Sequence, residues 1–499
     1  MDDLCVELQK LRDECGLNNV ALARRAAMDR PTVVHILSGH RRPTAENLET
    51  LLHALEATPT QRRRLLELYE EEKTDPATRR QREAVKGLIQ RVSRMHEENQ
   101  EQHIVLVENP KLQQRLEMET AIFNGHMEIV AALQQLILRY CKNPSGPLMI
   151  PPGLREEWLD LLPEILARAA GKGEIWHICT FIKRTAGRDE TIHNLNNLAY
   201  AIPLACLTGW QYKTHFCYSI SGEPLPAALF SSYILFPDSI FVIQRNGARA
   251  WMSHTPEIVE AARQAFEEDF NGAHSYLDVE IQDHDGAEAI MMNNSALDQQ
   301  CRPTWYLCWN PQLIGLLDKK EFLANMTVPP EAQAMAELIW RRVDEIAAVP
   351  ATTYCLAEGV QDFVATGLVA DIPASVYRPA DLRQRCLLLD RLIEASKGEH
   401  APHYLLSGKG LMPPRGFTLA VVEGVGVKIC QLFANDAQSG LCRTYFCSEP
   451  STTEAFCDYL KNLKNTGDVY SREESIAILQ QMRKICAMGG GKGPQNMCY

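Results

Sequence analysis

Residues 11–66 read LRDECGLNNVALARRAAMDRPTVVHILSGHRRPTAENLETLLHALEATPTQRRRLL, a succession of short helix-like segments separated by turn residues. Asn18, Asp29 and Thr44 each stand directly before a segment, where their side chains can accept hydrogen bonds from unpaired backbone N–H groups. Thr58 opens a Thr-x-x-Gln capping box, with proline at the first helical position. Together with the leucine-rich residues before position 11, this pattern predicts an all-α domain of five short helices.

A tight link between the second and third predicted helices is typical of a helix-turn-helix unit. The stretch resembles the lambda-repressor-like (Cro-type, also called XRE) DNA-binding family. The resemblance rests on Gly-Leu before the second helix, Ala-Leu-Ala-Arg-Arg-Ala within it, a Thr-Val-x-x-Ile frame in the third and a Gly-x-Arg-Arg-Pro-Thr link. Asn19 stands where the family usually has Gln, and Val34 and His35 stand where Ser and Arg are frequent. These departures leave the preferred bases open.

The charge distribution favours DNA binding independently of the resemblance. The whole chain is acidic, with 51 basic and 63 acidic residues and a net charge of −12, which excludes a uniformly basic nucleic-acid binder. Between Asn18 and Thr44, however, the sequence contains five arginines and only one acidic residue, Asp29, so the local net charge is +4. Such a local basic face is what phosphate contacts require. A protein-interaction module and a helix-turn-helix fold that does not bind DNA are the alternatives.

The resemblance also implies which residues contact DNA. The first residues of the third helix would face the major groove, where Arg30 can donate to guanine and Val34 or the Thr32 methyl can meet a thymine methyl. Asn19 would contact a phosphate or an adenine edge, and the arginines after the third helix would contact phosphates. The predicted DNA-binding residues are Asn19, Arg24, Arg30, Thr32, Val34, His35, Arg41 and Arg42.

A polar segment follows the N-terminal domain and contains one narrow apolar stripe. Its apolar residues recur at spacings of three and four, as on one face of a helix: Val85, Leu88, Ile89, Val92 and Met95. Such a stripe must be buried against a second copy or against the body of the same chain. Because family members usually pair two units across a two-fold DNA site, we expect a homodimer whose interface is shared between this helix and the C-terminal domain. Docking on the chain's own body is the alternative.

The remainder of the chain predicts a large mixed α/β body. Helices are expected at 116–139, 154–170 and 256–270, and strands at 175–182, 212–220, 233–236 and 239–244. Residues 229–270 and 417–463 show a similar pattern of two strands followed by a helix, which suggests two related halves. Chance similarity of strand–strand–helix units is the alternative. The expected domains are a helix-turn-helix domain at 1–70, a polar helical linker at 71–110, an α/β effector subdomain at 111–285, a second α/β subdomain at 286–488 and a flexible tail at 489–499.

The body shows no catalytic signature. The glycine-rich run at 489–493 lacks the Ser or Thr of a phosphate-binding loop, and there is no Gly-x-Ser-x-Gly elbow. Residues 230–270 resemble part of a phospholipase-D-like half-domain, but the His-x-Lys pair that this family needs is absent. We therefore predict no catalytic residue, no metal site and no cofactor, and we interpret the body as a sensor or dimerisation domain. An enzyme or phage-defence effector tethered to DNA is the alternative.

Two further features bear on location and partners. No apolar run reaches the roughly 18 residues of a membrane-spanning helix, and the N-terminus lacks the basic and apolar regions of a secretory signal. The 16 cysteines are scattered without a Cys-x-x-Cys pair, which favours reduced thiols. The sequence therefore predicts a cytoplasmic, repressor-like transcriptional regulator that binds double-stranded DNA and no membrane, forms a homodimer, and responds to an unidentified small-molecule or protein effector.

Overall fold

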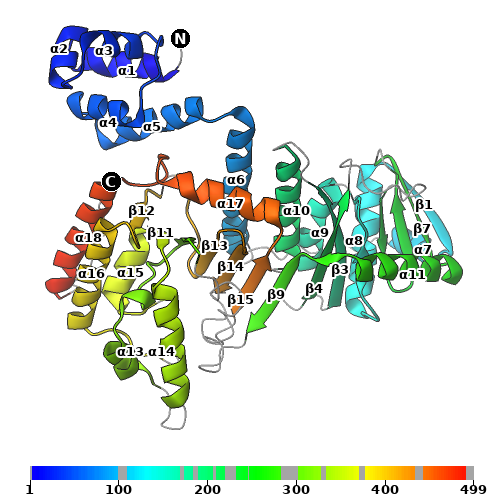
Figure 1. Ribbon diagram of the computed structural model, residues 1–499. Helices are drawn as coiled ribbons and strands as arrows, with labels where there is room; N and C mark the ends of the chain where they lie inside the picture. The colour runs from blue at the N-terminus through cyan, green and yellow to red at the C-terminus, as the bar shows by residue number, and fades with distance from the viewer. Residues whose placement is uncertain are drawn as a thin grey trace.

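The structure is a computed structural model with a group of short N-terminal helices, one long helix and a body built on two β-sheets (Figure 1). It describes residues 3–98, 110–154, 156–168, 173–183, 189–205, 210–219, 232–244, 247–282, 302–327, 333–369, 372, 377–408, 410–432 and 442–489. The tail expected at 489–499 lies outside these residues except for its first glycine. No helix among the described residues is both long and apolar enough to cross a membrane.

The N-terminal helices follow the boundaries that the capping residues predict. They are α1 (Asp3–Glu14), α2 (Asn19–Arg25), α3 (Arg30–Leu37), α4 (Ala45–Ala54) and α5 (Pro59–Lys73). The side chains of Asn18, Asp29, Thr44 and Thr58 each accept a hydrogen bond from a backbone N–H in the first turn of the helix that follows. Leucines from all five helices, together with Val33 and Ile36 of α3, form a separate buried core.

The first sheet has the strand order β1-β7-β6-β5-β2-β3-β4-β8. Its strands are β1 (Thr120–Asn124), β2 (Leu148–Ile150), β3 (Gly173–Ile182), β4 (Trp210–Ser219), β5 (Ser232–Leu235), β6 (Ile240–Ile243), β7 (Arg249–Ser253) and β8 (His274–Ser275). β2, β3 and β4 are parallel, and β5, β6 and β7 are antiparallel. The helices of this first lobe are α7 (Pro110–Leu116), α8 (His126–Lys142), α9 (Glu156–Arg168), α10 (Asp189–Ala205) and α11 (Pro256–Gly272).

The second sheet has the order β12-β11-β10-β13-β14-β15-β9. Its strands are β9 (Leu277–Gln282), β10 (Thr304–Cys308), β11 (Ala351–Leu356), β12 (His403–Leu406), β13 (Phe417–Val422), β14 (Gly426–Leu432) and β15 (Cys442–Cys447). The helices of this second lobe are a 3-10 turn (Ile314–Leu316), α13 (Lys319–Asn325), α14 (Gln333–Ala347), α15 (Ala357–Thr366), α16 (Leu382–Lys397), α17 (Pro450–Leu463) and α18 (Arg472–Ala487). Because β9 pairs with β15, the division expected at 285/286 does not coincide with the division between the sheets.

One secondary-structure prediction for the first lobe was wrong. The four predicted strands correspond to β3, β4, β5 and β6, but the helix predicted at 116–139 begins only at His126, because β1 occupies 120–124. In β1, Ala121 and Phe123 are buried and their neighbours are exposed, which is the period of a strand. Gly125 then adopts a φ of +81°, a conformation that separates β1 from α8.

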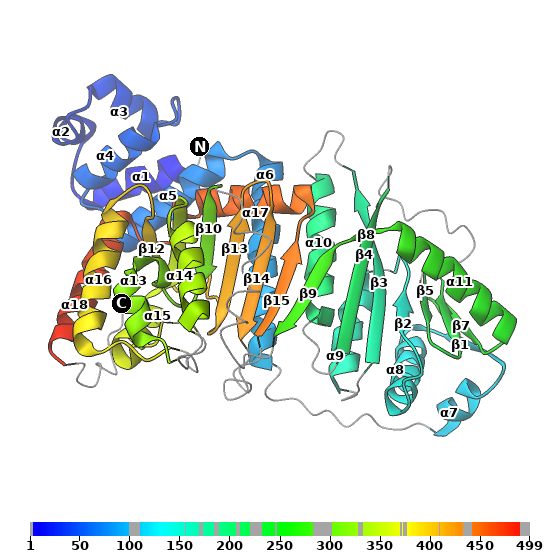
Figure 2. The same ribbon diagram turned by 60° about the horizontal axis from the view of Figure 1, so that its bottom comes forward.

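The long helix α6 (Pro76–Glu98) joins the N-terminal helices to both lobes. It packs on α10 of the first lobe and α17 of the second, and Figures 1 and 2 place it where the two lobes meet. Val85, Leu88, Ile89 and Val92 of the predicted stripe are at most 4% exposed within the single chain. The alternative in which the stripe docks on its own body is therefore confirmed for these four residues. The side chain of Met95 lies outside the described residues.

Candidate functional site

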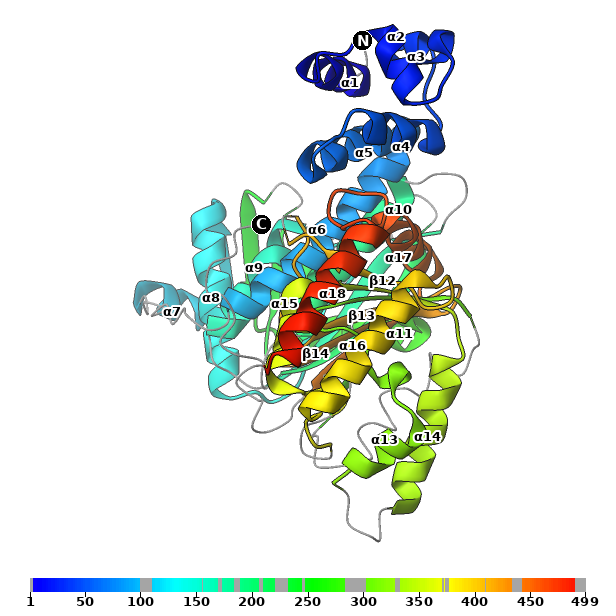
Figure 3. The same cartoon turned by 90° about the vertical axis from the view of Figure 1, so that its left-hand side faces the viewer.

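The helices that are predicted to contact DNA, α2 and α3, lie at one end of the molecule. Figures 1 and 3 show α2 and α3 at the end away from the two sheets, with α4 and α5 between them and the body. Val33, Ile36 and Leu37 are buried in the N-terminal core and fix the inner face of α3. Its remaining residues therefore point away from the core, and a nucleic acid has access to them.

Residues around the start of α3 are brought together as the sequence predicts. Arg30 and His35 are exposed, and Thr32 and Val34 are half-buried. Asp29 accepts a hydrogen bond from the backbone N–H of Thr32 at 2.9 Å. This backbone hydrogen bond, with that from the Thr32 hydroxyl, lowers the pKa of Asp29. The carboxylate therefore stays charged. It caps the first turn of α3 and attracts the guanidinium of Arg41.

The link after α3 folds back onto the start of the same helix. The guanidinium of Arg41 donates to the Thr32 hydroxyl oxygen at 3.5 Å, and the Arg41 backbone N–H donates to the carbonyl of His35 at 3.1 Å. Arg41 also contributes to lowering the pKa of Asp29. Arg41 and Thr32, predicted to meet phosphate and base respectively, thus share one corner of the domain. Arg42 is exposed beside them.

Asn19 has a contact that the sequence does not reveal. Its side-chain oxygen accepts a hydrogen bond from the guanidinium of Arg12 on α1 at 2.6 Å, and Arg12 also pairs with Asp13. The Asn19 oxygen is therefore engaged within the domain, and Arg12 is a positive group at the start of α2 that the sequence analysis missed. No short-range pattern links positions 12 and 19, because they are brought together only by the packing of α1 beside α2.

The arginines of this region fall into two groups. Arg25 forms an ion pair with Glu56. Within the described part of the chain, Arg24, Arg30 and Arg42 have no ion-pair partner, and all three are exposed. Unneutralised arginines on an accessible face supply the charge that counterion release from a nucleic acid requires.

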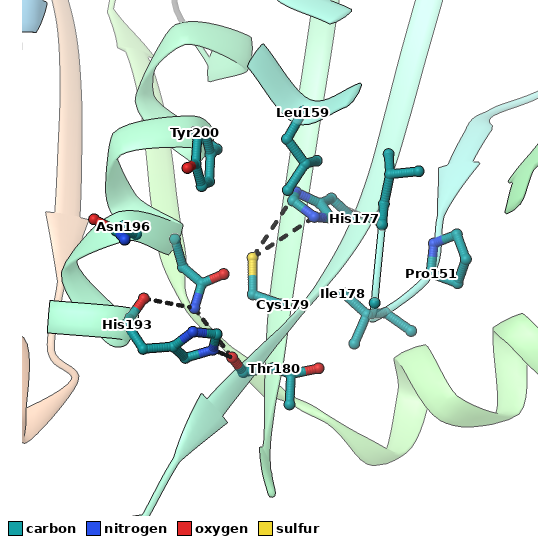
Figure 4. Close-up of a pocket in the computed structure, with 12 residues that line it drawn as sticks. Pro151, Leu159, His177, Ile178, Cys179, Thr180, His193, Asn196 and Tyr200 are labelled. Carbon is teal, nitrogen blue, oxygen red and sulfur yellow. Dashed lines mark hydrogen bonds between the residues drawn. The ribbon is translucent and has the colours of Figure 1, made fainter. Parts of the chain in front are cut away.

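A second feature of interest is a cavity in the first lobe (Figure 4). It measures about 80 Å³ and lies between β3, α10 and the segment that follows β2. Its walls are formed by Pro151, Gly153, Leu154, Leu159, His177, Ile178, Cys179, Thr180, His193, Asn196, Asn197 and Tyr200. The carbonyl of Thr180 accepts hydrogen bonds from His193 Nε2 at 2.9 Å and from Asn197 Nδ2 at 3.0 Å, which ties α10 to β3.

His177 and Cys179 in the cavity wall are both uncharged. Burial lowers the pKa of His177 to about 3 and raises the pKa of Cys179 to about 12. The Cys179 sulfur lies 3.8 Å from both ring nitrogens of His177, and the His177 Nδ1 is hydrogen-bonded to the Tyr212 hydroxyl at 2.8 Å. Transfer of a proton from this thiol to this imidazole would create two buried charges, which is unfavourable. Both groups therefore stay neutral in the cavity wall.

The sequence analysis did not single out this cavity. The scattered cysteines were interpreted only as reduced thiols, and the histidines were considered only in the search for a His-x-Lys pair, so neither Cys179 nor His193 was singled out. Across the described residues, no group of three or more His, Cys, Asp or Glu gathers as metal ligands would, and Cys179 is a free thiol. The His-x-Cys on β3 and the paired asparagines on α10 are common residue types that carried no distinctive signal.

Comparisons with solved structures give only weak likenesses. A phospholipase D family member from Salmonella typhimurium is 13% identical, with 39% of this chain and 99% of that chain covered at a TM-score of 0.22. Phosphatidylserine synthase from Haemophilus influenzae is 8% identical, with coverages of 77% and 98% and a TM-score of 0.23. TrmBL2, an archaeal chromatin protein, is 11% identical, with coverages of 55% and 100% and a TM-score of 0.22. Among curated proteins, none matches the chain.

The N-terminal helices match a known family much more specifically. A family model described as a helix-turn-helix domain matches residues 3–65, the segment that contains α1 to α4 and the first part of α5. The match coincides with the capped helices and with the exposed arginines described above. Residues 3–65 are therefore a helix-turn-helix domain of the XRE or Cro type.

Proposed function

We propose that the chain is a sequence-specific, DNA-binding transcriptional regulator whose C-terminal body senses an effector. The observation that carries this proposal is the helix-turn-helix domain at 3–65, with α3 accessible at the end of the molecule. The DNA-binding unit comprises residues 1–70, which contain α1 to α4 and most of α5, and the linker and the two body subdomains follow it. Regulation then requires that the body change the affinity or the orientation of this unit.

Within the DNA-binding unit, the roles are divided between bases and phosphates. Arg30, Thr32, Val34 and His35 on α3 enter the major groove, because the first residues of a recognition helix reach the base edges. The phosphate contacts come from the exposed Arg24, Arg41 and Arg42. Asn19 acts with Arg12 rather than alone, since its side-chain oxygen is held by that guanidinium.

The regulator acts as a homodimer. A single unit of this size buries too little surface for tight, specific binding, and members of the family read two half-sites. Because Val85, Leu88, Ile89 and Val92 of α6 are buried inside the chain, these residues do not form the dimer interface, which lies in the C-terminal body.

The body consists of two related halves without catalytic activity. In support, six strands of each lobe follow one topology: in chain order numbered one to six, both sheets run 6-5-4-1-2-3, with strands one to three parallel. A helix beginning with proline follows the sixth strand in each, α11 and α17. The uncharged His177 and Cys179 favour a binding body over an enzyme.

Capture of genomic fragments by the purified full chain, followed by sequencing, tests the proposal. The expected result is enrichment of a two-fold symmetric sequence with half-sites about 10–10.5 base pairs apart, and a weaker enrichment in the Arg30→Ala variant, without preference at one base position of each half-site. Captured fragments that share no sequence, together with an affinity that does not fall as salt rises, would refute DNA recognition by this chain.

A further inference from the structure

Helix α10 connects three parts of the molecule. Its inner side lines the cavity through His193, Asn196, Asn197 and Tyr200. It also packs along α6, and Asn194 donates to the Ser451 hydroxyl of α17 at 3.0 Å. A group that enters the cavity therefore touches the same helix that holds the connector α6 and the second lobe.

The cavity has the size of a binding site for a very small ligand. One water needs about 10–15 Å³ of such space, so a cavity of about 80 Å³ has room for roughly five to eight water-sized groups. Its walls combine apolar groups such as Leu159 and Ile178 with imidazole and amide groups, and among the described residues that line it there is no Lys, Arg, Asp or Glu. A few polar groups in an otherwise apolar concave wall are typical of sites that orient a small molecule.

We propose that this cavity binds a small neutral molecule bearing hydroxyl or amide groups, and that the two walls of the cavity transmit its binding to α6. A charged ligand would lose its hydration and meet no opposite charge among the described lining residues, which costs several kcal/mol. A neutral ligand instead meets the amide of Asn196, the side-chain oxygen of Asn197 and the second ring nitrogen of His193, since His193 Nε2 and Asn197 Nδ2 already donate to the Thr180 carbonyl. The transmission rests on the proposed role of the body as a sensor; the binding site itself does not.

The route to the DNA-binding domain runs through Arg91 of α6. Its guanidinium carbon lies 5.5 Å from the centre of the Tyr200 ring, and Tyr200 lines the cavity. The same guanidinium pairs with Asp160 on α9, next to the cavity-lining Leu159. Arg91 thus contacts both helices that form the cavity walls. A ligand that changes the spacing of α9 and α10 moves the Tyr200 ring relative to the Asp160 carboxylate. Because Arg91 contacts both, its position changes, and the position of α6 changes with it.

A movement of α6 is passed to the DNA-binding domain through a short connection. Only residues 74 and 75 separate α5 from α6, and the backbone N–H of Thr78 donates to the Asp75 carboxylate at 3.0 Å, which caps the start of α6. At the other side of this junction, the guanidinium carbon of Arg63 on α5 lies 5.5 Å from the centre of the Tyr470 ring of the second lobe. The orientation of the DNA-binding domain is therefore set by α6 and by the second lobe together.

Saturation-transfer NMR with the full chain tests the binding site. The probes are acetamide and glycerol, with acetate as the charged counterpart of acetamide. We expect saturation transfer to acetamide and glycerol and little to acetate. The Asn196→Leu variant removes the amide and keeps the branched shape and the number of side-chain heavy atoms, and it should lose this signal, whereas Asn465→Leu, at a half-buried asparagine outside the cavity, should retain it. Equal signals in both variants, a preference for acetate, or no transfer to either neutral probe would overturn the site.

The transmission is tested separately by DNA affinity. Saturating acetamide should change the Kd of the full chain for its captured DNA by about fivefold or more, the ordinary range of allosteric coupling. Arg91→Met retains the apolar stem and removes the cation, so it should keep saturation transfer and abolish the change in Kd. A Kd that does not respond to bound acetamide, or that responds equally in Arg91→Met, would overturn the transmission. A chain that binds acetamide but no DNA would instead overturn the proposed function and leave the site standing.

Discussion

Lys86 on α6 donates to the Asp468 carboxylate of the second lobe at 2.5 Å, and Arg91, five residues further along the same helix, pairs with Asp160 of the first lobe. A third ion pair joins Arg82 to Asp458 on α17. Partly exposed pairs of this kind stabilise a fold only modestly, but they fix the position of a helix whose apolar stripe is already buried. α6 is therefore a structural part of the body and not a free association element.

The double substitution Leu88→Glu, Val92→Glu should unfold the body rather than dissociate a dimer. Both side chains are at most 4% exposed, so each glutamate would place an unpaired charge among apolar groups. We expect a loss of several kcal/mol of unfolding free energy and a much lower unfolding temperature, measured by calorimetry. Glu83→Gln, at an exposed position of the same helix, is the control. A variant that stays folded but changes from dimer to monomer in light scattering would show that the stripe is the dimer interface.

Arg30→Ala should weaken DNA binding in a sequence-dependent way. A bidentate arginine–guanine contact discriminates against the wrong base by about 1–3 kcal/mol, so affinity for the captured sequence should fall by that amount. Preference at one base position should disappear at the same time. Competition binding with single-base variants of the site measures both effects. Uniform weakening at every position would mean that Arg30 contacts a phosphate.

The double substitution Arg41→Ala, Arg42→Ala should instead weaken binding to all sequences alike. Each lost phosphate contact lowers the slope of log affinity against log salt by about 0.9, so the loss of two contacts in each protomer of the dimer removes about 3.6. Titrations over a range of salt concentrations give the slope. Arg25→Ala is a matched control on the same domain, because Arg25 is held by Glu56. An unchanged slope in the double variant would remove both residues from the phosphate interface.

The sequence predicts the N-terminal domain well because its signals are local. Capping residues such as Asn18 and Asp29 act over three positions, and the structure places them where the pattern indicates. The strands β3, β4, β5 and β6 of the first lobe were found from runs of apolar and β-branched residues, whereas β2, β7 and β8 were not predicted. By contrast, β1 was missed because its five residues lie directly before an amphipathic helix, and the period of α8 dominates any longer window.

Features that depend on distant residues could not be predicted in this way. The cavity is lined by the segment after β2, by the middle of β3 and by one side of α10. The parallel pairing of β2 with β3 and the hydrogen bonds from α10 to Thr180 bring these distant segments together. The engagement of Asn19 by Arg12 likewise depends on the packing of α1 beside α2. The spacing of its residues identified the apolar stripe on α6, but it did not identify the surface that buries the stripe. An apolar stripe has the same sequence pattern whether it packs against a second copy or against its own chain.

The last prediction concerns acid. Burial lowers the pKa of His177 to about 3 and that of His403 to about 4, whereas an unfolded histidine titrates near 6.5. The unfolded chain therefore binds more protons than the folded one below about pH 6.5, so stability falls as the pH drops through this window. Each histidine contributes up to about 1.4 kcal/mol per pH unit, His403 down to about pH 4 and His177 down to about pH 3.

Amide hydrogen exchange of β3 and β12 at about pH 7 and about pH 5 measures this loss strand by strand. His177→Gln should reduce the pH dependence in β3 and leave that in β12, because Gln cannot take up a proton and His403 lies in the other lobe. His126→Gln, at an exposed position, is the control and should leave both strands as in the unaltered chain. If β3 in the His177→Gln variant loses as much protection on acidification as in the unaltered chain, then His177 is not buried in its neutral form. The cavity wall would in that case hold a charge, which would also remove the reason for expecting a neutral ligand.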